Sequence, residues 1–237
     1  YIDEYLKTEY TLKSTLKDSV QSSVYLYQKN DSAKQIVKIS QKNRNDHVLR
    51  RLRGQLNKNT ATIYEVCSND EDVTVLEEYI SGATLRHIVE ANGGTLKREL
   101  AVKYALDICN GLVFIHSLGI IHRDIKPSNI IITEQGEAVI IDFGIARLTD
   151  DSKYADTKNL GTAGYAAPEQ FGIYQSGPVT DIYAVGVLLN ELLLGVHPTI
   201  DTPKGKLGKV INKCIMAQMS KRYQNVSELA EVLNKLL

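Results

Sequence analysis

Alternation of apolar and polar residues marks the first third of the chain. Two alternating runs, residues 24–27 and 35–39, flank a polar turn and predict two antiparallel strands. Two further apolar runs, residues 63–66 and 73–76, flank an acidic turn and predict a second strand pair. We therefore expect a small, mostly β region over residues 1–80.

Apolar positions at helical spacing dominate the rest of the chain. One short amphipathic helix is already expected inside the first region, at residues 45–56, where apolar residues recur at intervals of three and four. The longer helical patterns that follow lie at residues 84–90, 97–118, 181–195 and 226–237. A hairpin pattern at residues 130–141 is embedded among them. The pattern predicts an α+β protein with a mainly helical second region over residues 81–237.

Composition and charge narrow the class of protein. The 237 residues are 43% hydrophobic and 24% charged, which is typical of a globular chain. Lys and Arg (28) balance Asp and Glu (28), so no overall positive field favours nucleic acid as a partner. The three cysteines are widely spaced, which favours reduced thiols and a cytoplasmic location.

Membrane contact is not expected of this chain. No run approaches the roughly 18 to 20 apolar residues that a membrane-spanning helix needs. The sequence begins at Tyr1 rather than at a methionine, which is consistent with a piece of a longer protein. We expect a cytoplasmic location, either for the chain by itself or for the cytoplasmic domain of a longer, membrane-anchored protein.

The densest chemical motif runs from His122 to Asn129 and is followed by Asp142, Phe143 and Gly144. These residues resemble the catalytic loop and the metal-binding triplet of eukaryotic-type protein kinases. Phosphoryl transfer needs one carboxylate at the substrate hydroxyl, while another carboxylate and an amide hold Mg²⁺ on the phosphates. The resemblance implies that Asp124 is the catalytic base and that Asp142 and Asn129 bind Mg²⁺ or Mn²⁺.

Further motifs extend the resemblance over residues 12–237. Residues 161–169 resemble the peptide-docking segment of protein kinases, and residues 181–186 resemble the start of their buried helix. In that family the glutamate that ends the docking segment, here Glu169, pairs with a late arginine, here Arg222. The chain is thus similar to bacterial eukaryotic-type (Hanks-type) Ser/Thr kinases. The implied fold is two-lobed, with a β-rich N-lobe over residues 1–80 and a helical C-lobe over residues 81–237.

The resemblance also assigns a nucleotide site to the N-lobe. Lys38 matches the lysine that binds the ATP phosphates, and Glu78 and Ile80 match the hinge residues whose backbone binds adenine. Ser19, Ser22 and Val24 match the phosphate-covering loop and the strand after it. Glu77 falls on the position that limits the depth of the adenine pocket. ATP is the implied cofactor.

Two features of the N-lobe depart from the family pattern. The first glycine of the chain is Gly54, and Lys17, Ser19 and Ser22 stand where the loop should carry glycines. Because serine resists the backbone conformations that glycine adopts, we expect weak ATP binding or a differently shaped loop. Asp18 adds a negative charge near the expected phosphates.

The second departure is a missing glutamate. In the family, a helix of the N-lobe carries a glutamate that pairs with the ATP-binding lysine. Asn45 falls at the expected position, and no glutamate occurs between Ser40 and Tyr64. Asp46, next to Asn45, is the expected partner of Lys38. We expect this helix to shift inward to complete the site, helped by an activator or by dimerisation through the N-lobe.

Substrate type and regulation follow from the catalytic loop. Lys126, two residues after Asp124, and Thr162 in the docking segment are typical of Ser/Thr rather than Tyr kinases. Arg123 marks the subclass in which phosphorylation of the activation segment forms an Arg–phosphate pair. The hydroxyl residues available are Thr149, Ser152, Tyr154 and Thr157, of which Thr157 is the preferred site.

The motifs together predict a Ser/Thr protein kinase that phosphorylates protein hydroxyls and its own activation segment. The alternative is a pseudokinase, a binding or scaffolding module of the same fold, which the glycine-free loop and the missing helix glutamate favour. The complete set of Lys38, Asp124, Asn129 and Asp142 opposes it. A small-molecule phosphotransferase is disfavoured because such enzymes lack a docking segment ending in Pro168 and Glu169.

Overall fold

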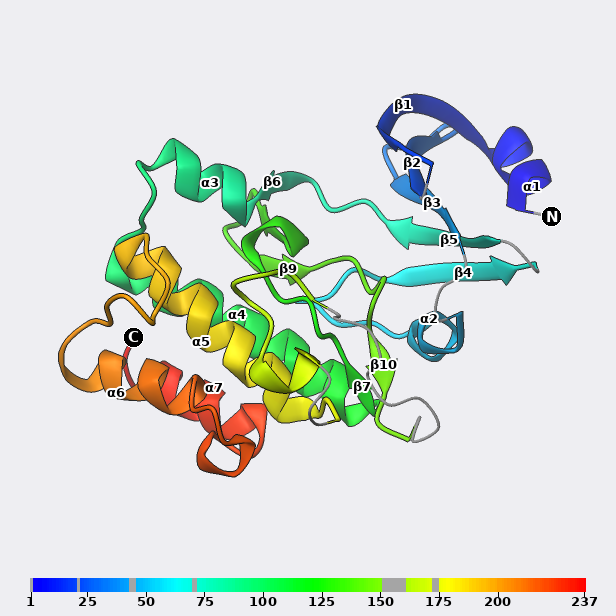
Figure 1. The fold of residues 1–237 in the computed structure, drawn as a ribbon. Helices are drawn as coiled ribbons and strands as arrows, with labels where there is room; N and C mark the ends of the chain where they lie inside the picture. Colours follow the sequence, from blue (N-terminus) through cyan, green and yellow to red (C-terminus); the bar gives the residue numbers. More distant parts are fainter. Residues whose placement is uncertain (1, 21, 43–45, 70–71, 151–160, 172–174) are drawn as a thin grey trace. The chain divides into compact units, whose positions relative to one another are not determined.

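A computed structural model describes residues 2–20, 22–42, 46–69, 72–150, 161–171 and 175–237 (Figure 1). The chain divides into two compact units. The first contains Tyr1–Asn57 and Ala61–Ile80, and the second contains Lys58–Thr60 and Ser81–Leu237. An antiparallel sheet dominates the first unit and helices dominate the second, so the predicted α+β class is confirmed.

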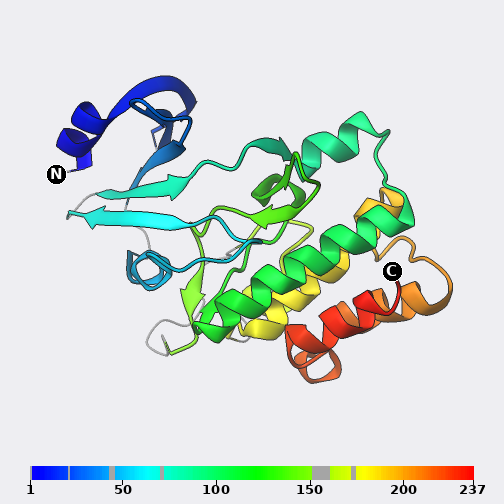
Figure 2. The same cartoon turned by 180° about the vertical axis from the view of Figure 1, so that it is seen from behind.

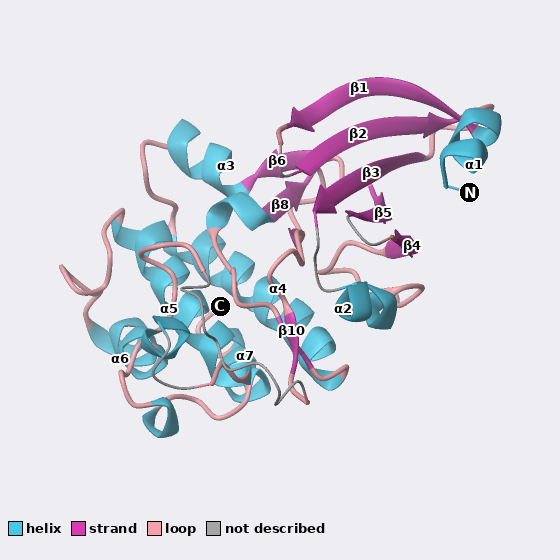
Figure 3. Cartoon of the chain, turned by 45° about the vertical axis from the view of Figure 1, so that its right-hand side comes forward, coloured by secondary structure: helices cyan, strands magenta, loops and turns pink. Residues whose placement is uncertain are grey.

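The first unit is built on a five-stranded antiparallel sheet with strand order β1-β2-β3-β5-β4 (Figure 3). Its strands are β1 (Tyr10–Asp18), β2 (Ser22–Lys29), β3 (Gln35–Lys42), β4 (Ile63–Ser68) and β5 (Asp72–Glu78). The alternating runs in the sequence therefore form strands as predicted. β1 is an edge strand, and its register with β2 is interrupted by two irregularities.

Cross-strand pairing separates two faces of this sheet, because directly opposed residues of antiparallel strands point to the same side. On one side Val24 pairs with Ile39, and Ile39 pairs with Val75. We call this side the Val24 face. Lys38 pairs with Leu76 on the opposite side, which we call the Lys38 face. The Val24 face is the more apolar of the two, and its buried members are Leu26, Val37, Ile63, Val66, Val73 and Val75.

A short helix, α2 (Asp46–Leu52), packs on the Val24 face. Asp46 and Arg50 both hydrogen-bond the hydroxyl of Ser68, which pairs with Val73 on that face. The sequence predicted a longer helix, over residues 45–56. The helix ends at Leu52 because Gly54 adopts a left-handed backbone (φ 74°) and donates its amide to the carbonyl of Ile63.

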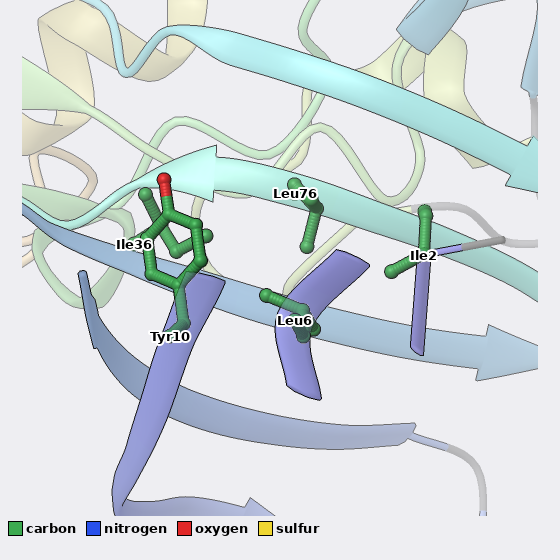
Figure 4. Close-up of a cluster of buried hydrophobic side chains, with 5 residues drawn as sticks. All are labelled: Ile2, Leu6, Tyr10, Ile36 and Leu76. Carbon is green, nitrogen blue, oxygen red and sulfur yellow. The ribbon is translucent and has the colours of Figure 1, made fainter. Parts of the chain in front are cut away.

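A second helix, α1 (Ile2–Glu9), packs on the Lys38 face and was not predicted from the sequence. Figure 4 shows Ile2, Leu6 and Tyr10 lying over Ile36 of β3 and Leu76 of β5. All five side chains are buried. The two faces of the sheet are thus covered by different helices, α1 on one side and α2 on the other.

The second unit is built around α4, which packs against α5 and α7 (Figure 2). Its helices are α3 (Leu85–Ala91), α4 (Arg98–Ser117), α5 (Pro178–Leu194), α6 (Gly205–Cys214) and α7 (Val226–Asn234). All except α6 were predicted. Its short strands are β6 (Gly82–Thr84), β7 (Ile120–Ile121), β8 (Ile130–Thr133), β9 (Ala138–Ile140) and β10 (Arg147–Leu148). No helix in the described part of the chain has the length and apolar character needed to cross a membrane.

Candidate active site

Asp124 lies at the centre of a hydrogen-bonded network between β7 and β8. Its Oδ2 atom accepts hydrogen bonds from Nζ of Lys126 at 2.7 Å and from Nδ2 of Asn129 at 2.9 Å. Its Oδ1 atom accepts a hydrogen bond from the hydroxyl of Thr162 at 2.7 Å. That hydroxyl accepts in turn from Lys126 at 2.7 Å. Three residues expected at the site from the sequence, Lys126, Asn129 and Thr162, therefore all hydrogen-bond the Asp124 carboxylate.

This network suits the handling of a hydroxyl group and a phosphate. The side chains of Asp124 and Lys126 are 14% and 19% exposed, so both are shielded but accessible. The carboxylate can accept the proton of an incoming hydroxyl, and the adjacent ammonium can neutralise a phosphoryl group. The bond to Thr162 links the catalytic loop to the segment expected to dock the substrate.

Asn129 and Asp142 offer a pair of oxygen ligands for a metal ion. Asn129 donates its amide nitrogen to Asp124, which leaves its side-chain oxygen as an acceptor. The amide of Ile141 donates to the carbonyl of Asn129 at 3.0 Å, and this bond holds the start of the 142–144 segment next to Asn129. Oδ1 of Asp142 accepts the amide of Gly144 at 3.0 Å. A carboxylate and an amide oxygen match the ligand preference of Mg²⁺, so these residues fit the expected metal.

Asp181, at the start of α5, anchors the backbone of the catalytic loop. Its carboxylate accepts the amides of His122 at 2.9 Å and Arg123 at 2.8 Å, and the ring of His116 lies 2.8 Å from Oδ2. Burial alone would raise the pKa of Asp181, but the hydrogen bond and charge of His116, together with the His122 amide, lower it below its usual value. The buried carboxylate therefore stays ionised and fixes two consecutive amides.

Arg123 holds a strained conformation within this loop. Its backbone is left-handed (φ 67°), which is uncommon for a residue other than glycine. Besides the bond to Asp181, Nε donates to the carbonyl of Ile145 at 2.8 Å, and its own carbonyl accepts from Gln170 at 2.9 Å. Such strain is retained only where the surroundings impose it, as at active sites.

His122 connects the catalytic loop with the segment that carries Asp142. Its ring is fully buried and meets Phe143 edge-on, with 5.3 Å between ring centroids. Burial lowers the pKa of His122. The imidazole is therefore neutral at pH 7 and serves as a packing element, with Nδ1 accepting the amide of Asp124 at 3.3 Å.

The predicted pairing of Glu169 with Arg222 is confirmed. NH1 and NH2 of Arg222 donate to the two carboxylate oxygens at 2.6 and 2.8 Å. Both side chains are buried, and Thr180 donates a further hydrogen bond to Glu169 at 2.9 Å. The end of the docking segment is thereby fastened to the helices of the second unit.

The structure adds a polar pair near the catalytic loop that the sequence analysis missed. The hydroxyl of Tyr165 donates a hydrogen bond to Glu191 of α5, and burial raises the pKa of Tyr165. Both residues line a cavity of about 160 Å³, together with Pro127 of the catalytic loop. A glutamate one turn before a helix end has no distinctive sequence pattern, so only the fold reveals its proximity.

The contacts of Lys38 differ from those predicted. Its Nζ atom lies 2.6 Å from Oδ1 of Asp3, in α1. Asp46, the expected partner, instead binds Nε of Arg50 at 3.1 Å and the hydroxyl of Ser68 at 3.0 Å. The predicted pairing of Lys38 with Asp46 is wrong because α2 packs on the Val24 face, whereas Lys38 points to the other side of the sheet.

The same register separates Lys38 from the other residues expected at the nucleotide. Val24 and Glu77 both lie on the Val24 face, because Glu77 is two residues after Val75 in β5. The β3 residue opposite Val75 on that face is Ile39. Asp18 pairs with Ser23 on the Lys38 face, so its charge also points away from Val24. Hence the sheet does not bring Lys38 together with Val24 and Glu77.

The turn between β1 and β2 is closed by its serines. Ser19 donates its amide to the carbonyl of Ser22 at 3.0 Å and its hydroxyl to the same oxygen at 2.8 Å. The amide of Ser22 returns a hydrogen bond to the Ser19 hydroxyl at 3.1 Å. The side chain of Ser19 thus satisfies the amide and the carbonyl of Ser22, and a glycine at position 19 would leave that amide free to bind phosphate.

The expected hinge follows β5. Glu78 is the last residue of β5, and its amide donates to the carbonyl of Thr62 at 2.9 Å. Ile80 lies beyond the strand and is half-buried. Backbone recognition of adenine at these two positions stays a prediction. Thr157 and Asn45 lie outside the described residues.

Comparison with known proteins relates most of the chain to one family. The family model described as protein kinase domain matches residues 10–237. A probable serine/threonine-protein kinase of Clostridium acetobutylicum is 33% identical over 207 residues, which cover 76% of this chain and 31% of that protein. A probable serine/threonine-protein kinase of Clostridium perfringens is 32% identical over 223 residues, with 81% and 32% covered.

A shorter match is closer in sequence. The probable serine/threonine-protein kinase PknB of Bifidobacterium longum is 42% identical over 127 residues, which cover 52% of this chain and 18% of that protein. The chain spans about a third or less of the length of each of these relatives.

Proposed function

The chain belongs to the protein kinase domain family, and we propose that it is the catalytic domain of a serine/threonine protein kinase that uses ATP with Mg²⁺ or Mn²⁺. One observation carries this proposal: the carboxylate of Asp124 is held by Lys126, Asn129 and Thr162 in a single network. Each group matches one requirement of phosphoryl transfer, and the names of the bacterial relatives support the same activity.

In the proposed reaction the chain positions a substrate hydroxyl against the γ-phosphate. Asp124 accepts the hydroxyl proton as the oxygen–phosphorus bond forms and the bond to the leaving ADP oxygen breaks. Lys126 neutralises charge on the transferred phosphoryl group. Asn129 and Asp142 would hold the divalent metal, which would supply positive charge to offset that of the phosphates.

The position of Lys126 supports serine and threonine as acceptors. Its ammonium lies between the carboxylate of Asp124 and the hydroxyl of Thr162, at 2.7 Å from each. The hydroxyl oxygen of the substrate, which accepts the phosphoryl group, must therefore approach Asp124 next to the Lys126 ammonium. Proteins that present Ser or Thr in an extended segment are the proposed substrates.

Phosphorylation of Thr157 is the proposed activating step. Arg123 lies at the base of the activation segment, where it binds the carbonyl of Ile145. A phosphate at Thr157 would form charge-assisted hydrogen bonds with Arg123 and order the residues between them. Mass spectrometry of active protein should find phosphate at this residue. An active sample without phosphate on the segment would exclude this form of activation.

The N-terminal sheet is the proposed site of dimerisation or activator binding, in a cytoplasmic setting. β1 is an edge strand, and Leu12 and Leu16 along it are each 51% exposed. Exposed apolar residues on an unpaired strand edge favour association with another chain. Sedimentation of the wild type against a Leu12→Lys, Leu16→Lys variant tests this proposal. Identical behaviour of the two would contradict it.

Incubation with γ-labelled ATP, Mg²⁺ or Mn²⁺ and a protein substrate tests the main proposal. The wild type should transfer label to Ser or Thr, and Asp124→Asn and Asp142→Ala should each abolish transfer. Asp201→Asn, which changes an exposed carboxylate outside the network, is the matched control and should transfer normally.

Failure of wild-type transfer together with retained nucleotide binding would instead identify the second candidate, a binding or scaffolding pseudokinase. The placement of Lys38 on the face opposite Val24 is the observation that favours it.

A further inference from the structure

Lys17 of β1 lies on the Val24 face of the sheet. It pairs directly with Val24, and Val24 pairs with Ile39. Because opposed residues of antiparallel strands point to the same side, the stem of Lys17 runs beside Val24 on the face that also carries Glu77. The family resemblance assigns Val24 and Glu77 to the nucleotide site.

No other lysine is assigned to this face among the described residues of the sheet. Ile39 stands in β3 where a lysine on the Val24 face would be needed, and an alkyl side chain cannot bind phosphate. Among the described residues of the five strands, Lys29, Lys38 and Lys42 all register on the Lys38 face. A further lysine, at position 13, falls at an irregularity of the β1–β2 pairing.

The location of Lys17 suits contact with phosphate. It precedes by two residues Ser19, which closes the turn expected to cover the phosphates. Its side chain is exposed, and within the described part of the chain it forms no ion pair. The adjacent Asp18 registers on the other face, so no carboxylate from this strand competes for the ammonium.

We propose that Lys17, and not Lys38, supplies the ammonium that binds the phosphates of ATP. The inference rests on the proposed kinase function and specifies which lysine serves it. A lysine is a compact charge on a flexible stem, so it can reach a phosphate from a neighbouring strand. Lys38 instead lies on the opposite face of the sheet, where its ammonium contacts Asp3 of α1.

Calorimetric titration of the whole chain with Mg–ATP and with adenosine tests the assignment. Adenosine lacks phosphates, so loss of a phosphate contact weakens ATP binding alone. Lys17→Met should raise the Kd for ATP about ten- to a hundredfold, as expected for loss of a hydrogen bond to a charged group, and leave the Kd for adenosine unchanged. Lys13→Met, in the same strand, is the matched control and should bind both ligands normally.

Moving the charge provides a second test. In the Lys17→Met background, Ile39→Lys places an ammonium on the same face from β3 and should recover part of the lost ATP affinity. Recovery would support the assignment, because a merely misfolded Lys17→Met variant could not be rescued this way.

Three results would overturn the inference. Unchanged ATP affinity in Lys17→Met would refute it while leaving the kinase proposal intact. Selective loss of ATP affinity in Lys38→Met, with Lys17→Met normal, would return the role to Lys38. A wild type that binds neither ATP nor adenosine would refute the proposed function, and the inference with it.

Discussion

Arg222 and Glu169 form a two-pronged ion pair whose side chains are only 0% and 1% exposed. The guanidinium also donates to the carbonyls of Met216 and Val179, so its donors are used within the protein. A buried charge with this many partners ties the docking segment to the helical unit. If either side chain were removed, the other would remain as an unpaired buried charge, which destabilises the folded protein.

Removal of one partner should therefore be costly. Arg222→Met leaves Glu169 as an uncompensated buried carboxylate, and we expect the free energy of unfolding to fall by about 3–5 kcal/mol. Arg86→Met is the control, because Arg86 and Glu90 form an exposed pair 3.9 Å apart. That change should cost about 0.5 kcal/mol or less. Urea unfolding measures both, and equal losses would contradict the account.

Much of the second unit could be predicted from the sequence because its elements are defined locally. The apolar spacing of α4 and α5 and the motif around Asp124 each depend on neighbouring residues along the chain. Glu169 and Arg222 could be paired only through the family resemblance, since 53 residues separate them. The helix α6 was missed although Leu207, Val210, Ile211 and Cys214 follow helical spacing, because Gly205 and Gly208 lower the helix propensity of this short segment.

The N-terminal sheet could be predicted only in part. The strands were evident from alternation, but alternation does not determine which face a strand turns toward its helix. A shift of one residue in register moves every side chain to the opposite face. Lys38 was assigned by the resemblance of residues 36–38 to the lysine strand and by its register with the hinge, and the pairing of Lys38 with Leu76 places it on the face opposite Val24. Helix α1 was missed because only Ile2 and Leu6 of its residues are buried.

Asp181→Asn should change the pH dependence of stability. The pKa of Asp181 is lowered in the folded protein, so its stabilisation is present above the unfolded-state pKa of about 3.9 and is lost as the pH falls through the folded-state pKa. The difference in unfolding free energy between wild type and Asp181→Asn should be largest near pH 7 and should narrow below about pH 4.

Chemical denaturation across this pH range measures the difference. An asparagine presents an NH₂ group to one of the two backbone amides, so the variant should also transfer phosphate more slowly. A difference that is constant with pH would show that the carboxylate charge does not stabilise the loop.

Thr162→Val should impair catalysis more than Thr162→Ser. Valine keeps the shape of threonine but removes the hydroxyl that bonds Asp124 and Lys126, both at 2.7 Å. Loss of a hydrogen bond to a charged group costs about 1.5–3 kcal/mol, which corresponds to roughly a 10- to 150-fold fall in kcat. Serine retains the hydroxyl and should stay within a few-fold of the wild type. Similar kcat values for the valine and serine variants would place the hydroxyl outside the reaction.

Helix α1 precedes the residues matched by the family model, and we expect it to stabilise the first unit mainly through apolar contacts. Leu6 is 2% exposed, so Leu6→Ala should reduce stability by about 2–5 kcal/mol. Asp3 is 70% exposed in its pair with Lys38, and Asp3→Ala should cost about 0–1 kcal/mol because solvent screens the charge.

Hydrogen exchange separates these contributions, because it reports protection strand by strand. Leu6→Ala should lower the protection of β3 and β5, which carry Ile36 and Leu76 beneath the helix, and leave α4 and α5 unchanged. Lys7→Ala, an exposed change in the same helix, is the control and should alter neither region. If Lys7→Ala and Leu6→Ala gave the same exchange pattern, the apolar contacts of α1 would not be the source of protection in β3 and β5.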